Sequence, residues 1–176
     1  YHFKTKSDTE VLLNSFIEWG EECQFKFNGM WAFAIWDKAM RKLFISRDRF
    51  GVKPLYYWFN GKKFAFASEQ KAFLALKDYP YDFDYGVLSN SICNWALLEG
   101  SDRSILKDVF RLAPGHSLSI KLGSHLKIRR WWNTLDHIDE ISEETPQEEL
   151  LERFTILFED ATRIRMRSDV SLGMAL

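Results

Sequence analysis

Asp8 is the residue of this chain whose position most favours a role in binding. It lies in the segment TKSDTEVLL, where Ser7 predicts the N-cap of a helix and Glu10, three residues on, completes a capping box. A carboxylate in the first helical turn is stabilised by the helix dipole by about 0.3–1 kcal/mol, which alone can explain an Asp there. The same carboxylate, exposed at the start of the helix, could instead receive the ammonium group of a substrate. The residues alone leave both interpretations open and favour the first.

A second concentration of charge lies in the segment RDRFGVKPLYY. Four charged side chains surround one tight turn: Arg47, Asp48, Arg49 and Lys53. They could bind an anion, or they could form a corner whose charged groups satisfy one another. The corner is favoured, because Asp48 supplies an acidic partner and Gly51 supplies the turn.

The thiols and imidazoles of the chain do not indicate a reaction. An activated cysteine needs a nearby base or a helix N-terminus to lower its pKa, and neither Cys23 nor Cys93 has one in sequence. We therefore expect both cysteines to serve packing, since free cysteine is among the most buried residue types. The four histidines have no ligand-like spacing, so no metal site is expected.

Composition limits the class of protein. The chain has 176 residues, 46% hydrophobic and 16% aromatic, which is enough to bury a sizeable core. Its 24 basic and 25 acidic residues give a net charge of -1, which argues against a surface for nucleic acid or acidic membranes. No apolar run is long enough to span a membrane, and no signal peptide is visible. Two cysteines favour a reducing, cytoplasmic location. Because the chain opens in mid-pattern with Tyr1, both ends are expected to be cut.

Hydrophobic periodicity predicts the elements that must position these residues. A helix begins after Ser7 and stops near Gly20, and a hairpin turn is expected at Asn60-Gly61. Ser68 is expected to cap a short helix over 69–76. Strands or strand-like runs are expected over 29–37, 41–48, 53–59, 60–68, 104–121 and 126–132, with a further helix over 83–98. The class is α+β, with helices covering a mostly antiparallel sheet.

The last third of the chain has a different pattern. A polar, acidic stretch predicts a linker. A long helix is predicted to follow over 144–167, with Thr145 as its cap and Pro146 in its first turn. The final residues, SDVSLGMAL, predict a strand. The residues by themselves therefore indicate an α+β sandwich followed by the start of an α/β domain.

Several of these segments resemble one enzyme family. The strings NGMWAFAIWD, SRDRFGVKPLYY and FASEQKAFL resemble the glutaminase domain of glutamine-hydrolysing asparagine synthetases, which are class II (N-terminal-nucleophile) amidotransferases. The string ERFTILFEDATRIRMRSDVSLGMAL resembles the start of their synthetase domain. The resemblance implies an αββα sandwich of the N-terminal-nucleophile hydrolase type, with its N-terminal part missing, over 1–125. It implies a linker over 126–145 and, over 146–176, the first helix and strand of an adenine-nucleotide α-hydrolase-like domain.

The resemblance also implies a two-site reaction. Glutamine is hydrolysed at one site, and ammonia passes through a tunnel to the other. There, ATP and Mg²⁺ activate aspartate as an adenylate, which ammonia converts to asparagine with release of AMP and pyrophosphate. The implied partners are glutamine, aspartate and ATP, with no nucleic acid or membrane and with a homodimer left open. The fragment itself is expected to be inactive and to bind neither ATP nor Mg²⁺.

Few functional residues carry over from the family. Its nucleophile is a cysteine at the mature N-terminus, a position matched by neither Cys23 nor Cys93, so no catalytic residue is assigned. Asp8 matches the aspartate that binds the α-amino group of glutamine. Ala175 and Leu176 match the edge of the nucleotide site, while the RDRFG segment looks architectural.

Other functions remain open at this stage. Relatives in polysaccharide or antibiotic pathways share the two-domain plan but aminate other carboxylates. A non-catalytic binding module is a second alternative. Glutamine-fructose-6-phosphate and phosphoribosyl-pyrophosphate amidotransferases share the first domain, but the segment after residue 145 disfavours them.

Overall fold

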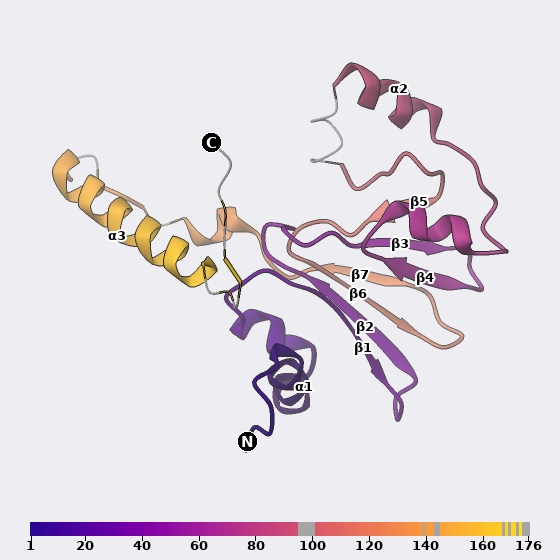
Figure 1. The fold of residues 1–176 in the computed structure, drawn as a ribbon, viewed down its shortest axis with the longest axis horizontal. Coiled ribbons are helices and arrows are strands. Elements are labelled where there is room, and N and C mark those ends of the chain that lie inside the picture. The colour runs from indigo at the N-terminus through magenta and orange to yellow at the C-terminus, as the bar shows by residue number, and fades with distance from the viewer. Residues whose placement is uncertain are drawn as a thin grey trace. The chain divides into compact units, whose positions relative to one another are not determined.

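The computed structural model of this chain describes residues 1–94, 101–138, 140–142, 145–166, 168, 170, 171 and 173. The chain divides into two compact units, Tyr1–Thr134 and Leu135–Leu176. The first unit contains all the strands of the described residues, and Figure 1 shows them with helix α1 at their side.

The first unit opens with the predicted helix, α1 (Asp8–Trp19). The Ser7 hydroxyl accepts a hydrogen bond from the Thr9 amide at 3.2 Å, so the predicted N-cap is confirmed. The helix stops at Gly20, which has a φ of 58° and donates its amide to the Phe16 carbonyl. A 3₁₀ helix, η1 (Gly20–Lys26), then leads the chain to the sheets.

Seven strands form two antiparallel sheets. The first sheet has the order β1-β2-β6-β7 and the second has the order β4-β3-β5. The strands are β1 (Ala32–Asp37), β2 (Lys42–Arg47), β3 (Tyr56–Phe59), β4 (Phe64–Ala67), β5 (Val109–Arg111), β6 (His116–Lys121) and β7 (Lys127–Arg130). Each strand segment predicted before residue 133 contains at least one of these strands, and the 104–121 run contains two because Pro114 and Gly115 interrupt it.

The hydrophobic core lies in the layers between these elements. Between the sheets, Ile45 and Leu118 of the first sheet pack with Leu55 and Leu112, while Tyr57 of the second sheet covers the cluster. The other face of the first sheet packs against α1, where Phe16 stacks on Phe44 with ring centres 5.7 Å apart.

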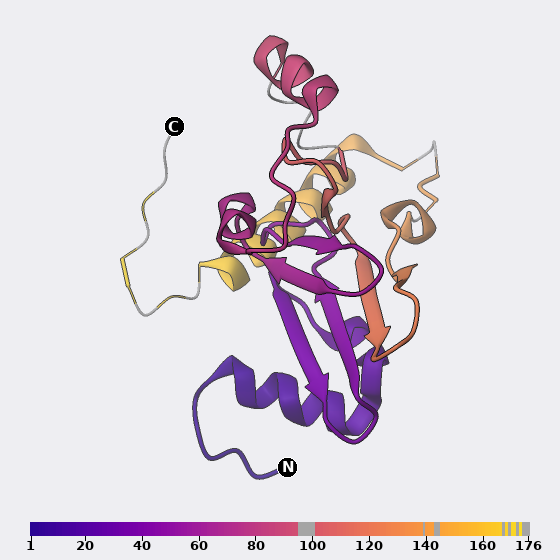
Figure 2. The ribbon, with the colours of Figure 1, turned by 90° about the vertical axis from the view of Figure 1, so that its right-hand side faces the viewer.

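A 3₁₀ helix covers the outer face of the second sheet. Phe73 of η2 (Gln70–Ala75) packs there with Tyr56 and Trp58 of β3. Figures 1 and 2 show the resulting order of helix, sheet, sheet and 3₁₀ helix. The predicted mixed architecture with antiparallel sheets is confirmed, and it is compatible with an N-terminal-nucleophile amidotransferase fold.

The hairpin predicted at Asn60-Gly61 is confirmed, since β3 pairs with β4 and Asn60 Oδ1 accepts from the amides of Lys62 and Lys63 in the turn. Two other local predictions differ from the structure. The predicted cap at Ser68 is wrong, since η2 begins at Gln70 without a side-chain cap. The helix predicted over 83–98 is observed as α2 (Tyr85–Cys93), which Asp84 caps by accepting from the Val87 amide.

The first unit extends beyond the boundary expected at residue 125. Strand β7 pairs with β6 along its whole length, so residues 127–130 belong to the sheet and not to a linker. The amides of Trp131 and Trp132 then both donate to the Gly115 carbonyl, at 2.8 and 3.1 Å. The sequence predicted a strand-like run over 126–132, but it did not predict the pairing with β6, because all four residues of β7 are exposed.

The second unit is dominated by α3 (Gln147–Arg165), preceded by the short 3₁₀ helix η4 (Thr134–His137). Pro146 occupies the N-cap position, so the helix begins slightly later than predicted and without the expected Thr145 cap. Of the strand predicted over 168–176, residues 168, 170, 171 and 173 are not in a strand, and Ala175 and Leu176 lie outside the described residues. Within the part of the chain that the structure describes, no helix is long and apolar enough to cross a membrane.

Candidate functional site

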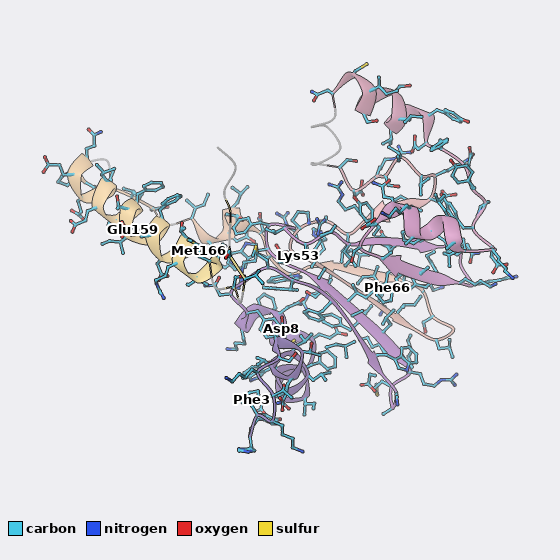
Figure 3. All side chains as sticks on the ribbon, viewed as in Figure 1. Phe3, Asp8, Lys53, Phe66, Glu159 and Met166 are labelled. Atoms are coloured by element: carbon cyan, nitrogen blue, oxygen red, sulfur yellow. The ribbon has the colours of Figure 1, made fainter. Side chains whose placement is uncertain are left out.

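Asp8 is the first residue of α1 and its side chain is exposed, as Figure 3 shows. Ser7 caps the helix, so the carboxylate of Asp8 is not needed for capping. Among the described residues, this carboxylate has no hydrogen-bond or ion-pair partner. The structure therefore presents an exposed carboxylate at the start of α1 that, among the described residues, remains available to accept hydrogen bonds from a ligand.

Glu10 does not complete the predicted capping box. A capping box would direct its carboxylate to the Ser7 amide. Instead, Glu10 Oε1 accepts from the Lys4 amide at 2.8 Å, and Oε2 accepts from the Thr5 amide at 2.7 Å and the Thr5 hydroxyl at 2.6 Å. Glu10 thus binds the segment that precedes the helix.

These hydrogen bonds lower the pKa of the Glu10 carboxyl below its ordinary value, with the Thr5 hydroxyl as the largest cause and the Lys4 amide next. The direction of the shift fixes its pH dependence. The interaction is fully present above the ordinary pKa of a glutamate, and it is lost as the pH falls through the lowered value. At neutral pH the segment before Asp8 is therefore held in place.

The Asp48 carboxylate is the centre of the RDRFG turn and is almost fully buried. Oδ1 accepts from the amides of Phe50 and Val52 at 3.1 and 3.0 Å, and Oδ2 accepts from the amides of Lys53 and Trp31 at 3.1 and 3.3 Å. One side chain thereby joins the end of β2, the following turn and the residue before β1. A carboxylate that accepts four backbone amides compensates for the cost of its burial.

Arg47 completes this corner from the other side. Its guanidinium donates to three backbone carbonyls, those of Lys53 at 2.7 Å and of Leu112 and Gly51 at 2.5 Å. Burial lowers the pKa of Arg47 from its ordinary value. The predicted corner is thus observed. Its partners differ from the prediction, which expected the charged side chains to pair with one another: Arg47 and Asp48 both bind backbone groups instead. This favours an architectural role over anion binding.

The sequence did not predict the surroundings of Arg49. Its guanidinium carbon lies 4.5 Å from the ring centre of Trp132, 5.5 Å from that of Trp131 and 5.9 Å from that of Trp31. Its Nη1 also donates to the Phe27 carbonyl. Through these cation–π contacts Arg49 connects the tryptophans that follow β7 with the tryptophan that precedes β1. The only sequence signal was the density of tryptophan and arginine near both segments.

The two thiols occupy different environments. Cys23 is completely buried in η1, and burial raises the pKa of its thiol to about 11. Cys93 is exposed at the end of α2. The prediction that Cys23 serves packing is confirmed, whereas Cys93 is not packed.

We expect this difference to be visible in thiol labelling. In the folded protein near pH 8, an alkylating reagent should modify Cys93 and leave Cys23 unmodified, because a thiol with a raised pKa stays protonated and a buried one is inaccessible. Mass spectrometry of tryptic peptides would report both sites. Denatured protein is the control, in which both should react, and rapid labelling of Cys23 in folded protein would contradict this placement.

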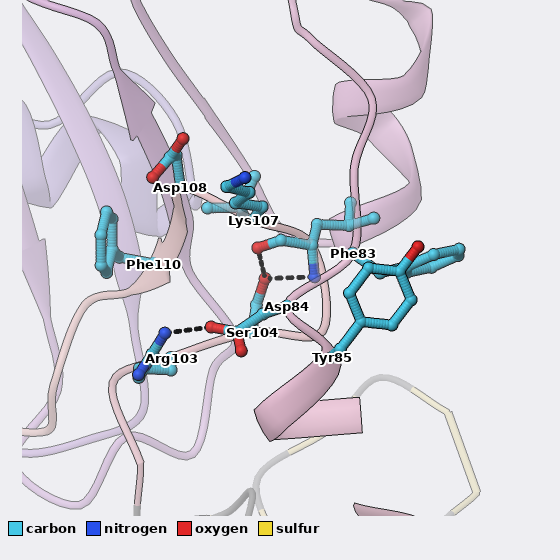
Figure 4. A pocket seen from close by; sticks show the side chains of 10 residues that line it. Phe83, Asp84, Tyr85, Arg103, Ser104, Lys107, Asp108 and Phe110 are labelled. Atoms are coloured by element: carbon cyan, nitrogen blue, oxygen red, sulfur yellow. Dashed lines mark hydrogen bonds and ion pairs between the residues drawn. The ribbon is translucent and has the colours of Figure 1, made fainter. Parts of the chain in front are cut away.

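One cavity of the first unit is lined by residues other than Asp8. It has a volume of about 320 Å³ and is lined by Phe83, Tyr85 and Phe110 together with charged side chains. Figure 4 shows Arg103 beside Asp84, with which it forms an ion pair. Lys107 pairs with Asp82 in the same region. Because its cations already have acidic partners, the cavity does not have the character of an anion site.

Metal binding has no support within the described ranges of the chain. Those residues contain no group of three or more His, Cys, Asp or Glu side chains that could hold a metal ion. The described chain therefore offers one candidate for substrate contact, Asp8, and separately two structural clusters, around Asp48 and Arg49, that join segments of the sheets.

The two antiparallel sheets of the first unit are compatible with the fold of a glutamine amidotransferase domain. A family model with that description, "Glutamine amidotransferase domain", matches residues 1–132. The chain belongs to this family.

Curated relatives extend the similarity over almost the whole chain. Asparagine synthetase [glutamine-hydrolyzing] 3 of Bacillus subtilis is 37% identical over 97% of this chain, which spans 27% of that relative. Putative asparagine synthetase [glutamine-hydrolyzing] 2 of Methanocaldococcus jannaschii is 37% identical over 98% of this chain, which spans 33% of it. An amidase of Penicillium rubens, chyE, is 28% identical over the full chain. The predicted family is confirmed, and the chain spans only a minor part of these relatives.

Proposed function

We propose that this chain is part of an ATP-dependent, glutamine-hydrolysing ligase of the asparagine synthetase type. The observation that carries the proposal is the 37% identity to two asparagine synthetases over 97% and 98% of the chain, well beyond the end of the amidotransferase match at residue 132. The similarity covers residues both before and after residue 132. It therefore supports a protein in which glutamine hydrolysis is coupled to a second reaction.

In this proposal Asp8 binds the α-ammonium group of glutamine. Its position at the start of α1, its exposure and its lack of a partner among the described residues support this role. A carboxylate and an ammonium group form a charge-assisted hydrogen bond, which is about twice as strong as a neutral one. Asp8 would orient the substrate, and the chemistry would take place at the other end of the glutamine molecule.

The hydrolytic step requires a nucleophile that neither cysteine of this chain supplies. Attack on the side-chain amide needs a thiolate, a base and donors for the oxyanion. Cys23 is buried with its pKa raised to about 11. The family resemblance implies an N-terminal cysteine whose own α-amine is the base, contributed by a part of the protein other than these residues.

The second reaction belongs to the second unit in this proposal. ATP with Mg²⁺ would activate the carboxylate of aspartate, and ammonia would displace AMP to give asparagine. Ala175 and Leu176 are proposed to border the nucleotide, but both lie outside the described residues. Helix α3 would support that region, with Glu148 and Glu149 in its first turn and Arg163 and Arg165 in its last, as the helix dipole favours.

An acceptor other than aspartate is the main alternative. The similarity to a protein named amidase shows that relatives of this chain are not all named asparagine synthetases. A product assay with aspartate, glutamine and ATP separates the two functions, because only the first predicts asparagine.

We expect the 176-residue chain alone to release no glutamate from glutamine. Cys23 is inaccessible and protonated at neutral pH, and Cys93 is exposed on α2 without an activating partner. The measurement is an enzymatic glutamate assay, run beside the full-length protein, which should release glutamate and form asparagine when aspartate and ATP are added. Glutamate release by the chain alone that Cys93→Ala abolishes would overturn this assignment, as would a full-length protein with no response to glutamine.

A further inference from the structure

Glu10 is the residue of the candidate site whose contacts exceed what a helix start requires. We propose that Glu10 is a positioning residue for glutamine, acting through Thr5 and Ser7 on Asp8. This inference rests on the proposed role of Asp8. Its basis is a set of side-chain hydrogen bonds made by Glu10 and Thr5, which the capping of α1 does not need and which join the Ser7 cap beside Asp8.

The chain of hydrogen bonds runs from Glu10 to both neighbours of Asp8. The Thr5 hydroxyl donates to Glu10 Oε2 at 2.6 Å and accepts from the Ser7 amide at 3.2 Å. The Ser7 hydroxyl accepts from the Thr9 amide at 3.2 Å, and the Ser7 carbonyl accepts from the Glu10 amide at 3.2 Å. The backbone is therefore restrained at Ser7 and Thr9, and this restraint also fixes the backbone conformation of Asp8 between them.

The hydrogen bonds of the Glu10 carboxylate restrain a different segment from the one that an N-cap restrains. Ser7 caps α1 by itself, so the helix keeps its N-cap without the Glu10 carboxylate. The carboxylate holds the amides of Lys4 and Thr5, which lie before the helix. Restraining this segment before glutamine arrives removes an ordering cost from binding. The loss of Glu10 should therefore appear in the KM for glutamine and not in the rate of the chemical step.

The chemistry of the three donors explains why a carboxylate is required. An ionised glutamate offers two oxygens that only accept, and here they accept from three donors. A glutamine at this position can place its oxygen toward Thr5, but its NH₂ group would then face the Lys4 amide, which is also a donor. Glu10→Gln should keep part of the interaction, and Glu10→Ala should lose all of it.

The test compares matched variants of the full-length protein. Glu10→Ala should raise the KM for glutamine about tenfold, the scale of losing hydrogen bonds to a charged group, with kcat changed less than about twofold. Glu10→Gln and Thr5→Val should give smaller increases. The double variant Glu10→Ala/Thr5→Val should be no worse than Glu10→Ala, because both residues act through one chain of bonds.

Glu18→Ala is the control, since Glu18 lies on the same helix and accepts from the Tyr1 hydroxyl at 3.0 Å. Glu18→Ala should leave the KM for glutamine unchanged, and activity with ammonia in place of glutamine should be unchanged in every variant.

Asp8→Asn is measured in parallel. If Asp8→Asn raises the KM and Glu10→Ala and Thr5→Val do not, the role of Glu10 is refuted while the proposed function stands. If none of the variants affects glutamine use, the proposed role of Asp8 is refuted as well, whereas an unmodified full-length protein with no response to glutamine would refute the proposed function itself. Equal losses with glutamine and ammonia would show a purely structural role for Glu10.

Discussion

Replacing Asp8 by Asn in the full-length protein is expected to lower kcat/KM for glutamine about 100-fold, the scale of removing one partner from a charged pair. The variant keeps the size of the side chain and removes only its charge, so the ammonium group of glutamine loses its partner. The Ser7 cap of α1 does not involve the Asp8 side chain, so the helix should remain intact. Steady-state glutamate release measures the effect.

Activity with ammonia separates binding from folding in this experiment. Ammonia enters the second reaction without glutamine, so product formation from ammonia should stay within about twofold of the unmodified protein. Asp78→Asn is a suitable control, because Asp78 is an exposed aspartate that forms an ion pair with Lys63 in the same unit. An equal fall with glutamine and with ammonia would show that Asp8 supports structure and does not bind substrate.

Replacing Asp48 by Ala is expected to destabilise the first unit by about 4 kcal/mol. The substitution leaves four backbone amides without their acceptor, and each such buried group costs about 1–3 kcal/mol, with water recovering part of the sum. Asp48→Asn keeps one acceptor oxygen but directs an NH₂ group at other donors, so a loss of about 2 kcal/mol is expected. Urea unfolding followed by tryptophan fluorescence would measure both changes.

Asp37→Ala is the matched control for this measurement. Asp37 accepts a single amide, that of Met40 at 2.8 Å, in an exposed turn between β1 and β2. Its loss should cost about 0.5–1 kcal/mol, the usual net value of one exposed hydrogen bond. If the two alanine variants were equally stable, the corner around Asp48 would contribute far less to the fold than its contacts indicate.

The sequence predicted those features that depend on local pattern. The α1 start at Ser7, its stop at Gly20 and the strands on both sides of the RDRFG turn follow from capping, glycine and periodicity, and the structure contains them. The α2 cap was missed because Asp84 is followed by Tyr85 and Gly86, which obscure the signal. Local rules thus located the element that carries the candidate site.

The features that were not predicted depend on contacts between distant segments. Glu10 has the spacing of a capping box, yet its carboxylate reaches Lys4 and Thr5, a choice that sequence spacing does not encode. The stacking of Arg49 on Trp132 joins residues far apart in the chain. The inclusion of β7 in the first unit likewise depends on backbone pairing with β6, which its exposed, basic side chains conceal.

The Asp48 corner also determines which changes this turn can accept over evolutionary time. Its carboxylate contacts the main-chain amides of residues 50, 52 and 53, and any amino acid except proline provides such an amide. Among residues 50–53 only Gly51 is restricted in identity, because its φ is 66° and a Cβ there would lie 2.8 Å from Pro114 Cγ. The turn is consequently permissive toward substitution and intolerant of insertion or deletion. For residues 50–53, the number of residues therefore matters more to this corner than the side chains they carry.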